Sequence, residues 1–181
     1  MKNPQFSYYK APVKNLKPYT SVTLQQVFKG ITGEFFKTQT QRLRTLKEND
    51  ARKYKAMRFD YVTFSGTFTQ RRIEGLKENS GLICLDFDHL GPDITGIKTR
   101  LIKDPEIAPQ LLFVSPGGNG LKLVLEIDLE EASHKIWFLA LSNYYKANHQ
   151  LEADKSGSDV SRACFLGWDP EAYINPKYVQ P

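Results

Sequence analysis

Short apolar runs separated by polar turns and helical segments form the clearest pattern of the chain, and they dominate residues 79–181. Apolar alternation predicts strands at 81–88, 110–115, 121–127 and 162–168, and helical periodicity predicts helices at 93–103 and 130–149. The order is β-α-β-β-α-β, which is typical of an RRM-like or ferredoxin-like antiparallel sheet. In that arrangement the first and third strands are central neighbours, helices cover one face, and the other face is open to a ligand or another lobe.

The pattern is weaker in the first 78 residues. It predicts an irregular segment at 1–20, a helix at 21–31 capped near Ser21, a helical stretch at 34–58 broken near Asn49, and a strand at 59–64. The sequence therefore predicts one α+β domain over residues 1–181, with an N-terminal α/β lobe (1–78) and an RRM-like catalytic lobe (79–181). The ending "INPKYVQP" is typical of a domain boundary, so we expect the N-terminal part of a longer protein.

Period-two alternation assigns the two faces of the predicted sheet. On the strand at 81–88, the side chains of Ile83, Leu85 and Phe87 share one face, and those of Asp86 and Asp88 share the other. On the strand at 121–127 the leucines share a face that must pack on the helices, which leaves Lys122, Val124 and Glu126 on the opposite face. The two strands thus independently predict that polar side chains gather on the helix-free face.

Composition narrows the class of protein. The chain is 40% hydrophobic, no apolar run has the length of a membrane span, and the first residues contain no signal-peptide hydrophobic region. Its two cysteines lie in apolar segments, which favours free thiols, a cytoplasmic location and no membrane partner. The net charge is +5, and residues 37–77 are rich in Lys and Arg. Such a stretch suits a phosphate-binding face or a solvated basic helix face.

The pair Asp86 and Asp88 is the first candidate for chemistry. Two carboxylates ~5 Å apart repel by roughly 3 kcal/mol at an effective dielectric of 20, so either a nearby cation offsets the repulsion or the pair retains one proton. A divalent ion such as Mg2+ or Mn2+, held by carboxylates and substrate phosphates, is a common solution. Exposed aspartates at a strand end are the alternative, because a lone D-x-D is a weak motif.

Two further segments lead to the same face. In "SPGGNGLK", Gly118 and Gly120 permit the close backbone approach that phosphate-cradling loops require, while Ser115 and Lys122 supply a hydroxyl and a cation. A plain hairpin turn explains the glycines equally well. In "LEADKSGSDVSRACFLGWDP", a third carboxylate is available from Asp154 or Asp159, and Arg162 can reach a phosphate. A polar loop with Asp residues as caps is the alternative there.

With these motifs together, the sequence resembles the archaeo-eukaryotic primase (primase-polymerase) superfamily, and within it the virulence-E N-terminal-like family. Members of that family often precede helicase-type domains in mobile genetic elements. "LICLDFD" matches the D-x-D motif, "SPGGNGLK" matches the Ser-x-Gly-x-Gly-x-His motif in outline, and "VTFSGTFTQRR" and "DVSRACFLGWDPEAYINP" resemble segments of the narrower family. The resemblance covers the chain from about residue 6.

The resemblance implies a DNA primase-polymerase that performs metal-dependent nucleotidyl transfer in the replication of a mobile element. Asp86 and Asp88 inherit the role of ligands for Mg2+ or Mn2+, with Asp154 first and Asp159 second as the third carboxylate. Ser115, Gly118 and Gly120 inherit contacts to nucleotide phosphates, helped by Lys122 and Arg162. The partners implied are a DNA template and primer, nucleoside triphosphates, and a fused or separate helicase. The basic lobe, with Arg52, Lys55, Arg71 and Arg72, would hold the nucleic acid.

One departure keeps a second function open. Lys122 stands where the superfamily motif has His, and an ammonium does not reproduce the hydrogen bonding of an imidazole. The alternative is a catalytically degenerate module that binds nucleic acid or nucleotide. A haloacid-dehalogenase-type phosphatase is disfavoured because Leu90 stands where Thr or Val is needed. A rolling-circle nuclease is disfavoured because no two histidines flank a single hydrophobic residue.

Overall fold

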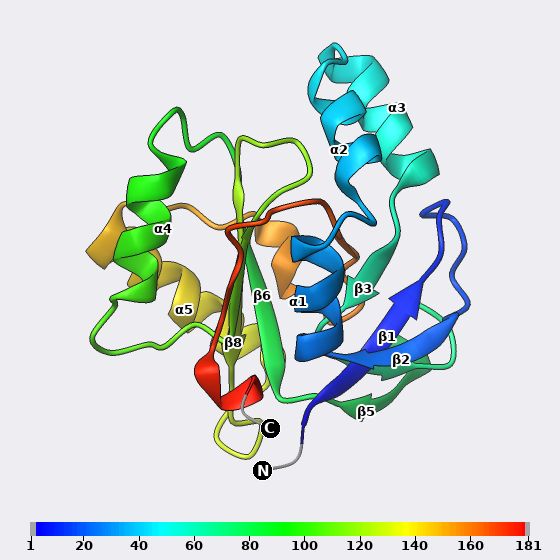
Figure 1. The fold of residues 1–181 in the computed structure, drawn as a ribbon. Helices are drawn as coiled ribbons and strands as arrows, with labels where there is room; N and C mark the ends of the chain where they lie inside the picture. The colour runs from blue at the N-terminus through cyan, green and yellow to red at the C-terminus, as the bar shows by residue number, and fades with distance from the viewer. Residues whose placement is uncertain (1–2, 180–181) are drawn as a thin grey trace.

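Two four-stranded antiparallel sheets and five α-helices make up the α+β domain in the computed structural model, which describes residues 3–179 (Figure 1). The first sheet has the order β2 (Thr20–Thr23), β1 (Gln5–Tyr9), β3 (Tyr61–Thr63) and β9 (Cys164–Phe165). The second has the order β10 (Tyr173–Ile174), β7 (Leu111–Val114), β8 (Leu121–Glu126) and β6 (Leu82–Phe87). A small separate hairpin pairs β4 (Gly66–Phe68) with β5 (Leu76–Asn79).

The elements predicted for the second lobe are present, and local chemistry explains their ends. β6 pairs antiparallel with β8 in the register Asp86 to Lys122, so these two strands are neighbours as expected. Helix α4 (Ile94–Ile102) begins after Asp93, whose side chain accepts a hydrogen bond from the Gly96 N–H. Helix α5 (His134–His149) begins after Ser133, which caps it in the same way. Within the described residues, no helix combines the length and apolar character needed to cross a bilayer.

The predicted position of the last strand in that sheet is wrong. Only Cys164–Phe165 of the segment 162–168 is a strand, and it pairs with β3 in the first sheet rather than with β6. The following backbone N–H groups are also bound to the N-terminal lobe: that of Leu166 donates to the Asp60 carbonyl (3.0 Å) and that of Asp169 to the Ile31 carbonyl (3.1 Å). At the edge of β6 that does not face β8, the Asp154 N–H donates a hydrogen bond to the Asp86 carbonyl at 2.8 Å.

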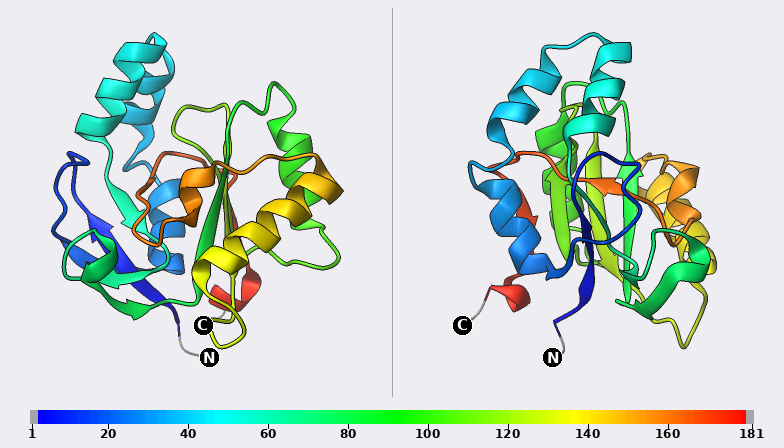
Figure 2. Two further views of the ribbon diagram at one scale, coloured as in Figure 1. Left: turned by 180° about the vertical axis from the view of Figure 1, so that it is seen from behind. Right: turned by 90° about the vertical axis from the view of Figure 1, so that its right-hand side faces the viewer.

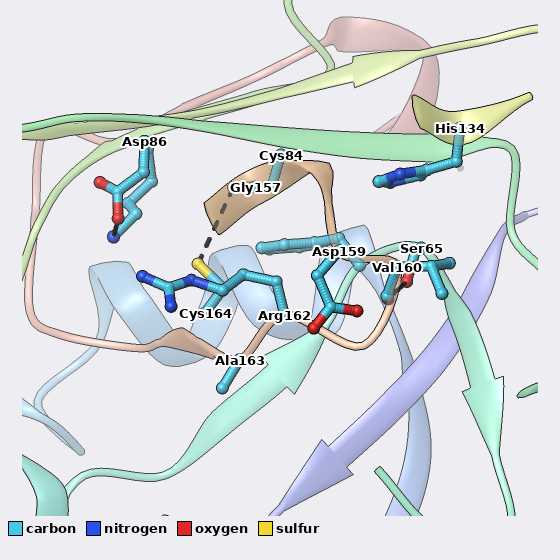
Figure 3. A pocket seen from close by; sticks show the side chains of 12 residues that line it. Ser65, Cys84, Asp86, His134, Gly157, Asp159, Val160, Arg162, Ala163 and Cys164 are labelled. Atoms are coloured by element: carbon cyan, nitrogen blue, oxygen red, sulfur yellow. Dashed lines mark hydrogen bonds and ion pairs between the residues drawn. The ribbon is translucent and has the colours of Figure 1, made fainter. Parts of the chain in front are cut away.

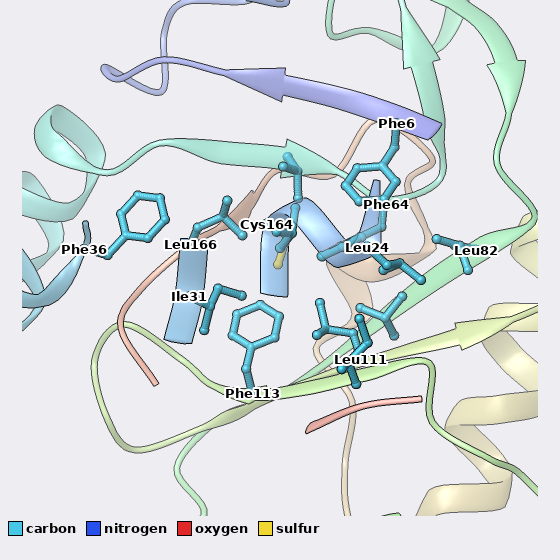
Figure 4. Close-up of a cluster of buried hydrophobic side chains, with 14 residues drawn as sticks. Phe6, Leu24, Ile31, Phe36, Phe64, Leu82, Leu111, Phe113, Cys164 and Leu166 are labelled. Atoms are coloured by element: carbon cyan, nitrogen blue, oxygen red, sulfur yellow. The ribbon is translucent and has the colours of Figure 1, made fainter. Parts of the chain in front are cut away.

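Both faces of the second sheet are buried, one against each half of the molecule. Ile83, Leu85 and Phe87 pack with the leucines of β8 against α4 and α5, which confirms the predicted helix-packed face. The opposite face, with Leu82 and Val124, packs against α1 (Leu24–Thr32) and the first sheet (Figures 2 and 4). The face that the sequence left open to a ligand or another lobe is therefore largely covered by the N-terminal lobe, and its polar end lies at the rim of the contact.

The N-terminal lobe differs from its prediction in three places. Residues 5–9 form β1, a central strand that buries Phe6 and Tyr9, where an irregular segment was expected. Helix α1 is capped by Thr23, not near Ser21, and Thr23 and Gln26 bond each other's backbone in a capping box. The helical stretch breaks at 45–47, earlier than expected, into α2 (Lys37–Arg44) and α3 (Glu48–Arg58), which project as a hairpin from the body (Figures 1 and 2).

A buried ion pair joins α4 to the segment after β9. The Lys98 ammonium lies 2.9 Å from the Asp169 carboxylate, and the two side chains are 9% and 6% exposed. Asp169 also accepts hydrogen bonds from the backbone N–H groups of Val114 (2.8 Å) and Glu171 (3.0 Å). The pair therefore fixes α4, β7 and the C-terminal segment to one another.

Replacing Asp169 with Ala is expected to lower the free energy of unfolding by about 3–5 kcal/mol, because it leaves the Lys98 charge buried without its partner. Urea unfolding followed by circular dichroism measures the change. The matched control is Glu152→Ala, which removes one partner of the exposed Lys146–Glu152 pair and should leave the unfolding midpoint nearly unchanged. Equal losses in the two variants would contradict the structural role of the buried pair.

Candidate metal and nucleotide site

Three carboxylates from two separate segments meet at the end of β6. Asp86 and Asp88 come from the end of that strand, and Asp154 comes from the loop after α5. One oxygen from each carboxylate lies within 4.8 Å of the others. Asp159, the other candidate third carboxylate, is not part of this triad; its Oδ1 accepts hydrogen bonds from the Ser161 N–H (2.8 Å) and hydroxyl (2.9 Å).

Asp154 is held in place by hydrogen bonds to its backbone and its side chain. Its N–H donates to the Asp86 carbonyl at 2.8 Å, which places the residue beside β6. Its carboxylate accepts from the N–H (3.0 Å) and hydroxyl (2.6 Å) of Ser156 and from the Arg162 guanidinium (3.0 Å). Burial acts to raise the pKa of Asp154, but these partners hold it below its ordinary value. The carboxylate is therefore ionised at neutral pH.

Lys122 supplies the nearest positive charge to the triad. Its ammonium forms an ion pair with Asp86 Oδ2, and the residue is only 8% exposed. Burial favours the neutral amine, yet the ion pair with the Asp86 carboxylate helps to hold the pKa of Lys122 above its ordinary value. Lys122 is thus a charged counter-ion for Asp86, and its contact to nucleotide phosphates stays a prediction.

The donor set of the triad fits a hard divalent cation. Asp86 Oδ1 is buried and has no hydrogen-bond partner among the described residues, although Oδ2 is paired with Lys122. A buried carboxylate oxygen without a partner is costly, and a bound cation removes that cost. Mg2+ and Mn2+ take oxygen ligands of this kind, so Asp86, Asp88 and Asp154 are the residues that would hold one.

The glycine loop between β7 and β8 lies directly against the triad. The Ser115 N–H donates to the Gly120 carbonyl (2.8 Å) and the Gly118 N–H to the Ser115 carbonyl (2.9 Å), which closes a tight turn. Gly118 has a φ of +83°, a conformation that favours glycine. A Cβ at Gly120 would lie 2.5 Å from the Phe87 carbonyl oxygen, so only glycine permits the approach of the loop to β6.

A cleft of about 360 Å³ collects most of the residues that the sequence singled out. The predicted site residues that line it are Arg52, Lys55, Arg71, Asp86, Asp88, Ser115, Lys122 and Arg162. Its volume lies within the range of small-molecule sites. Burial and, secondarily, the Lys122 charge lower the pKa of Lys55 below its ordinary value. An anion near Lys55 would therefore stabilise its charged form.

Five predicted residues do not line the cleft, and one of them is Gly120, which lies against the end of β6. Asp154 belongs to the triad without lining this cleft, and Gly118 of the glycine loop contacts Arg44 instead, whose Nε would lie 3.0 Å from a Cβ at this position. Arg72 is exposed and does not line the cleft. Asp159 lines a smaller cavity next to the cleft, together with Cys84 and other residues (Figure 3).

Two basic features of the site were missed from the sequence. Arg44 of α2 donates from Nε to the Pro116 carbonyl (3.2 Å) and from Nη2 to the Trp168 carbonyl (3.4 Å), and so it ties the glycine loop to the helical hairpin. Among the many cations of residues 37–77, no sequence signal distinguishes Arg44 from its neighbours.

The second missed feature is the loop at 10–19, which presents exposed Lys14 and Lys17 beside the cleft. It lines a surface hollow of about 550 Å³, and it is held by the Val13 N–H, which donates to the Ala56 carbonyl (2.8 Å). Val13 also lines the cleft, so the hollow and the cleft adjoin. The sequence does contain a signal for this basic loop, because residues 1–33 include five lysines and no acidic residue.

A family profile described as "BT4734-like, N-terminal domain" matches residues 53–174, about two thirds of the chain. The chain belongs to this family. The matched region includes β6, the glycine loop and the whole triad, but not Arg44 or the loop at 10–19. Neither the comparison with curated proteins nor that with solved structures gave a match.

Asp154→Asn is expected to weaken Mn2+ binding roughly tenfold or more, because the variant removes one of three charged ligands. Isothermal titration with MnCl2 measures the affinity. Asp159→Asn is the matched control, since it removes the same charge outside the triad and should retain the affinity of the unmodified protein. Equal weakening in the two variants would mean that Asp154 is not a ligand.

Proposed function

We propose that the domain is a metal-dependent nucleotidyltransferase of the primase-polymerase type, which adds nucleotides to a DNA primer or starts one during replication of a mobile element in the cytoplasm. The observation that carries the proposal is the carboxylate triad beside a glycine loop, with Asp86 and Asp88 of the triad lining a cleft that has a basic wall. The order β6-α4-β7-β8-α5 supports the RRM-like interpretation of the second lobe, although its fourth strand lies elsewhere.

The charges of the site favour joint binding of a metal ion and a triphosphate. The three carboxylates of the triad face three cations: Lys122 pairs with Asp86, Arg162 pairs with Asp154, and the charge of Lys55 interacts with those of Asp86 and Asp88. These six charged groups are therefore close to neutral together, and Arg52 and Arg71 add positive charge to the cleft. A divalent cation adds positive charge that the several negative charges of a nucleoside triphosphate offset, so each ligand is expected to strengthen binding of the other.

Each part of the cleft has a role in this function. Asp86, Asp88 and Asp154 would hold Mg2+ or Mn2+, which when bound activates a primer hydroxyl and neutralises phosphate charge. The glycine loop that begins at Ser115 offers backbone N–H groups and a hydroxyl to the phosphates. Lys55 lies where it can add a positive charge to the triphosphate.

The basic surface around the cleft suits a nucleic acid. Arg52 of α3 and Arg71 line the cleft, and the loop at 10–19 continues the positive charge with Lys14 and Lys17. Arg71 also has a structural part, since its Nη2 donates to the Val13 carbonyl (3.3 Å) and its N–H to the Leu16 carbonyl (2.8 Å). A template strand bound here would place its end near the triad, and a helicase would supply single-stranded template.

One observation favours a second candidate, a nucleic-acid-binding module without catalysis. Lys122 is buried against Asp86, so part of the charge of the triad is already neutralised in the absence of a metal. A domain that had lost its metal would need such an internal cation to remain folded. This alternative predicts binding of nucleic acid or nucleotide with no incorporation.

Mn2+-dependent incorporation of nucleotides on primed and unprimed templates tests the enzymatic proposal. Asp88→Asn is the sharpest variant, because Asp88 is exposed and its replacement leaves the Lys122–Asp86 pair intact. Its rate is expected to fall at least roughly hundredfold, as when one electrostatic group is removed from an active site. Asp159→Asn should keep the rate of the unmodified protein.

Two results of that assay would count against the enzyme. Incorporation that is unaffected by Asp88→Asn would exclude the triad as the catalytic centre. Absence of incorporation on every template, together with intact nucleic-acid binding, would support the binding module instead.

Salt dependence of single-stranded DNA binding tests the basic surface. The double variant Arg52→Gln/Lys14→Gln is expected to reduce the slope of log K against log salt concentration by about 1.4, since each lost phosphate contact removes about 0.7. Fluorescence anisotropy with a labelled oligonucleotide measures the slope. The control Lys103→Gln/Lys135→Gln removes the same charge from exposed positions in and next to α4 and α5, and it should leave the slope unchanged. Equal slopes in the two double variants would contradict the assignment of this surface.

A further inference from the structure

Cys84 and Cys164 face each other across the contact between the two sheets. Cys84 lies in β6 and Cys164 in β9, and their sulfur atoms are 3.9 Å apart (Figure 3). The residues are 80 positions apart in the chain, so the fold alone brings them together. Both are free thiols. Two thiols in direct contact need only a small movement to become a disulfide.

The thiols also line a cavity that a small oxidant can enter. The cavity has a volume of about 30 Å³, enough for a water-sized molecule, and its walls include both cysteines as well as Asp86, Lys122 and Arg162 (Figure 3). Cys164 itself is 5% exposed, so bulky reagents do not reach it from the surface. The geometry thus selects a small, uncharged oxidant such as hydrogen peroxide.

We propose that Cys84 and Cys164 form a modification site, at which a hydroperoxide converts the two thiols into a reversible disulfide that joins the two sheets. The sulfur of one cysteine attacks a peroxide oxygen, the O–O bond breaks, and a sulfenic acid and water form. The second sulfur then attacks the sulfenic sulfur, the S–S bond forms, and a second water leaves with the remaining thiol proton. Two thiols lose two electrons, and one hydrogen peroxide is reduced to two waters.

Closing the bond changes the site next to it. A disulfide requires a sulfur separation of ~2.05 Å, so the two sulfur atoms must approach each other by about 2 Å. Cys84 lies in a six-residue strand paired along its length with β8, whereas Cys164 lies in a strand of two residues. The β9 side therefore moves more easily. Arg162, two residues before Cys164, moves with it and shifts relative to Asp154, the residue it pairs with at 3.0 Å.

The test is thiol counting by intact mass on the full chain. The reduced protein is treated with hydrogen peroxide, unfolded, and labelled with N-ethylmaleimide. We expect a mass lower by two hydrogen atoms, no maleimide adduct, and a proteolytic fragment that links the peptides of Cys84 and Cys164. Dithiothreitol should restore both adducts. Cys84→Ser and Cys164→Ser should each lose the linked product.

Several outcomes would overturn the proposal. They are two adducts after peroxide treatment, a gain of oxygen atoms without loss of hydrogen, or disulfides found only between molecules. The measurement on the unmodified chain decides the matter even where a serine variant fails to fold.

The effect on the neighbouring site rests on the proposed metal centre and has its own readout. Oxidation is expected to change the Mn2+ affinity at least twofold, reversibly with dithiothreitol. An unchanged affinity would overturn the coupling to Arg162. Failure of the reduced protein to bind Mn2+ would contradict the metal site and leave the disulfide result valid.

Discussion

The hydrogen bond from the Asp154 N–H to the Asp86 carbonyl, 2.8 Å long, fixes the loop after α5 against β6 and thereby shapes the whole site. Its net energy is about 1 kcal/mol, as for other backbone hydrogen bonds, so its importance is geometric. It places the loop after α5 at the free side of β6, where a fourth strand would otherwise pair. The chain must then continue past this sheet, and β9 joins β3 of the N-terminal sheet. The same bond brings the third carboxylate to Asp86 and Asp88.

Three carboxylates placed close together repel one another, and nearby cations of the site offset this repulsion. The oxygens lie within 4.8 Å of one another, and two unit charges at that limit repel by roughly 3 kcal/mol at an effective dielectric of 20. Lys122 enters from the neighbouring strand, Arg162 from the segment that leads into β9, and Lys55 from α3. The cations come from three different parts of the fold. The site is therefore complete only when both lobes and the crossing segment are assembled.

Local patterns in the sequence predicted the second lobe well, because β6 and β8 alternate regularly and α4 and α5 carry side-chain caps. The same alternation placed Lys122 beside Asp86, as the register shows. The strand with which β9 pairs could not be predicted. A strand of two residues is too short to show an alternation of apolar and polar side chains, and its partner β3 lies about one hundred positions earlier in the chain. β1 was missed because prolines surround a short buried strand. Whether Asp154 or Asp159 joins the triad depends on the backbone hydrogen bond between Asp154 and Asp86, and the pattern of side chains in the sequence does not reveal such a bond.

The presence of a lysine at position 122 bears on the proposed catalysis through the two oxygens of Asp86. Lys122 pairs with Oδ2, while Oδ1 is buried and has no hydrogen-bond partner in the described part of the chain. A cation bound at Oδ1 would leave the ion pair at Oδ2 in place, so the lysine and a metal do not compete for the same atom. Lys122 also lowers the net negative charge that the metal meets, and the metal affinity then depends more on the phosphates that arrive with it. Under the proposed function, the ammonium would therefore favour metal binding coupled to nucleotide over metal binding alone.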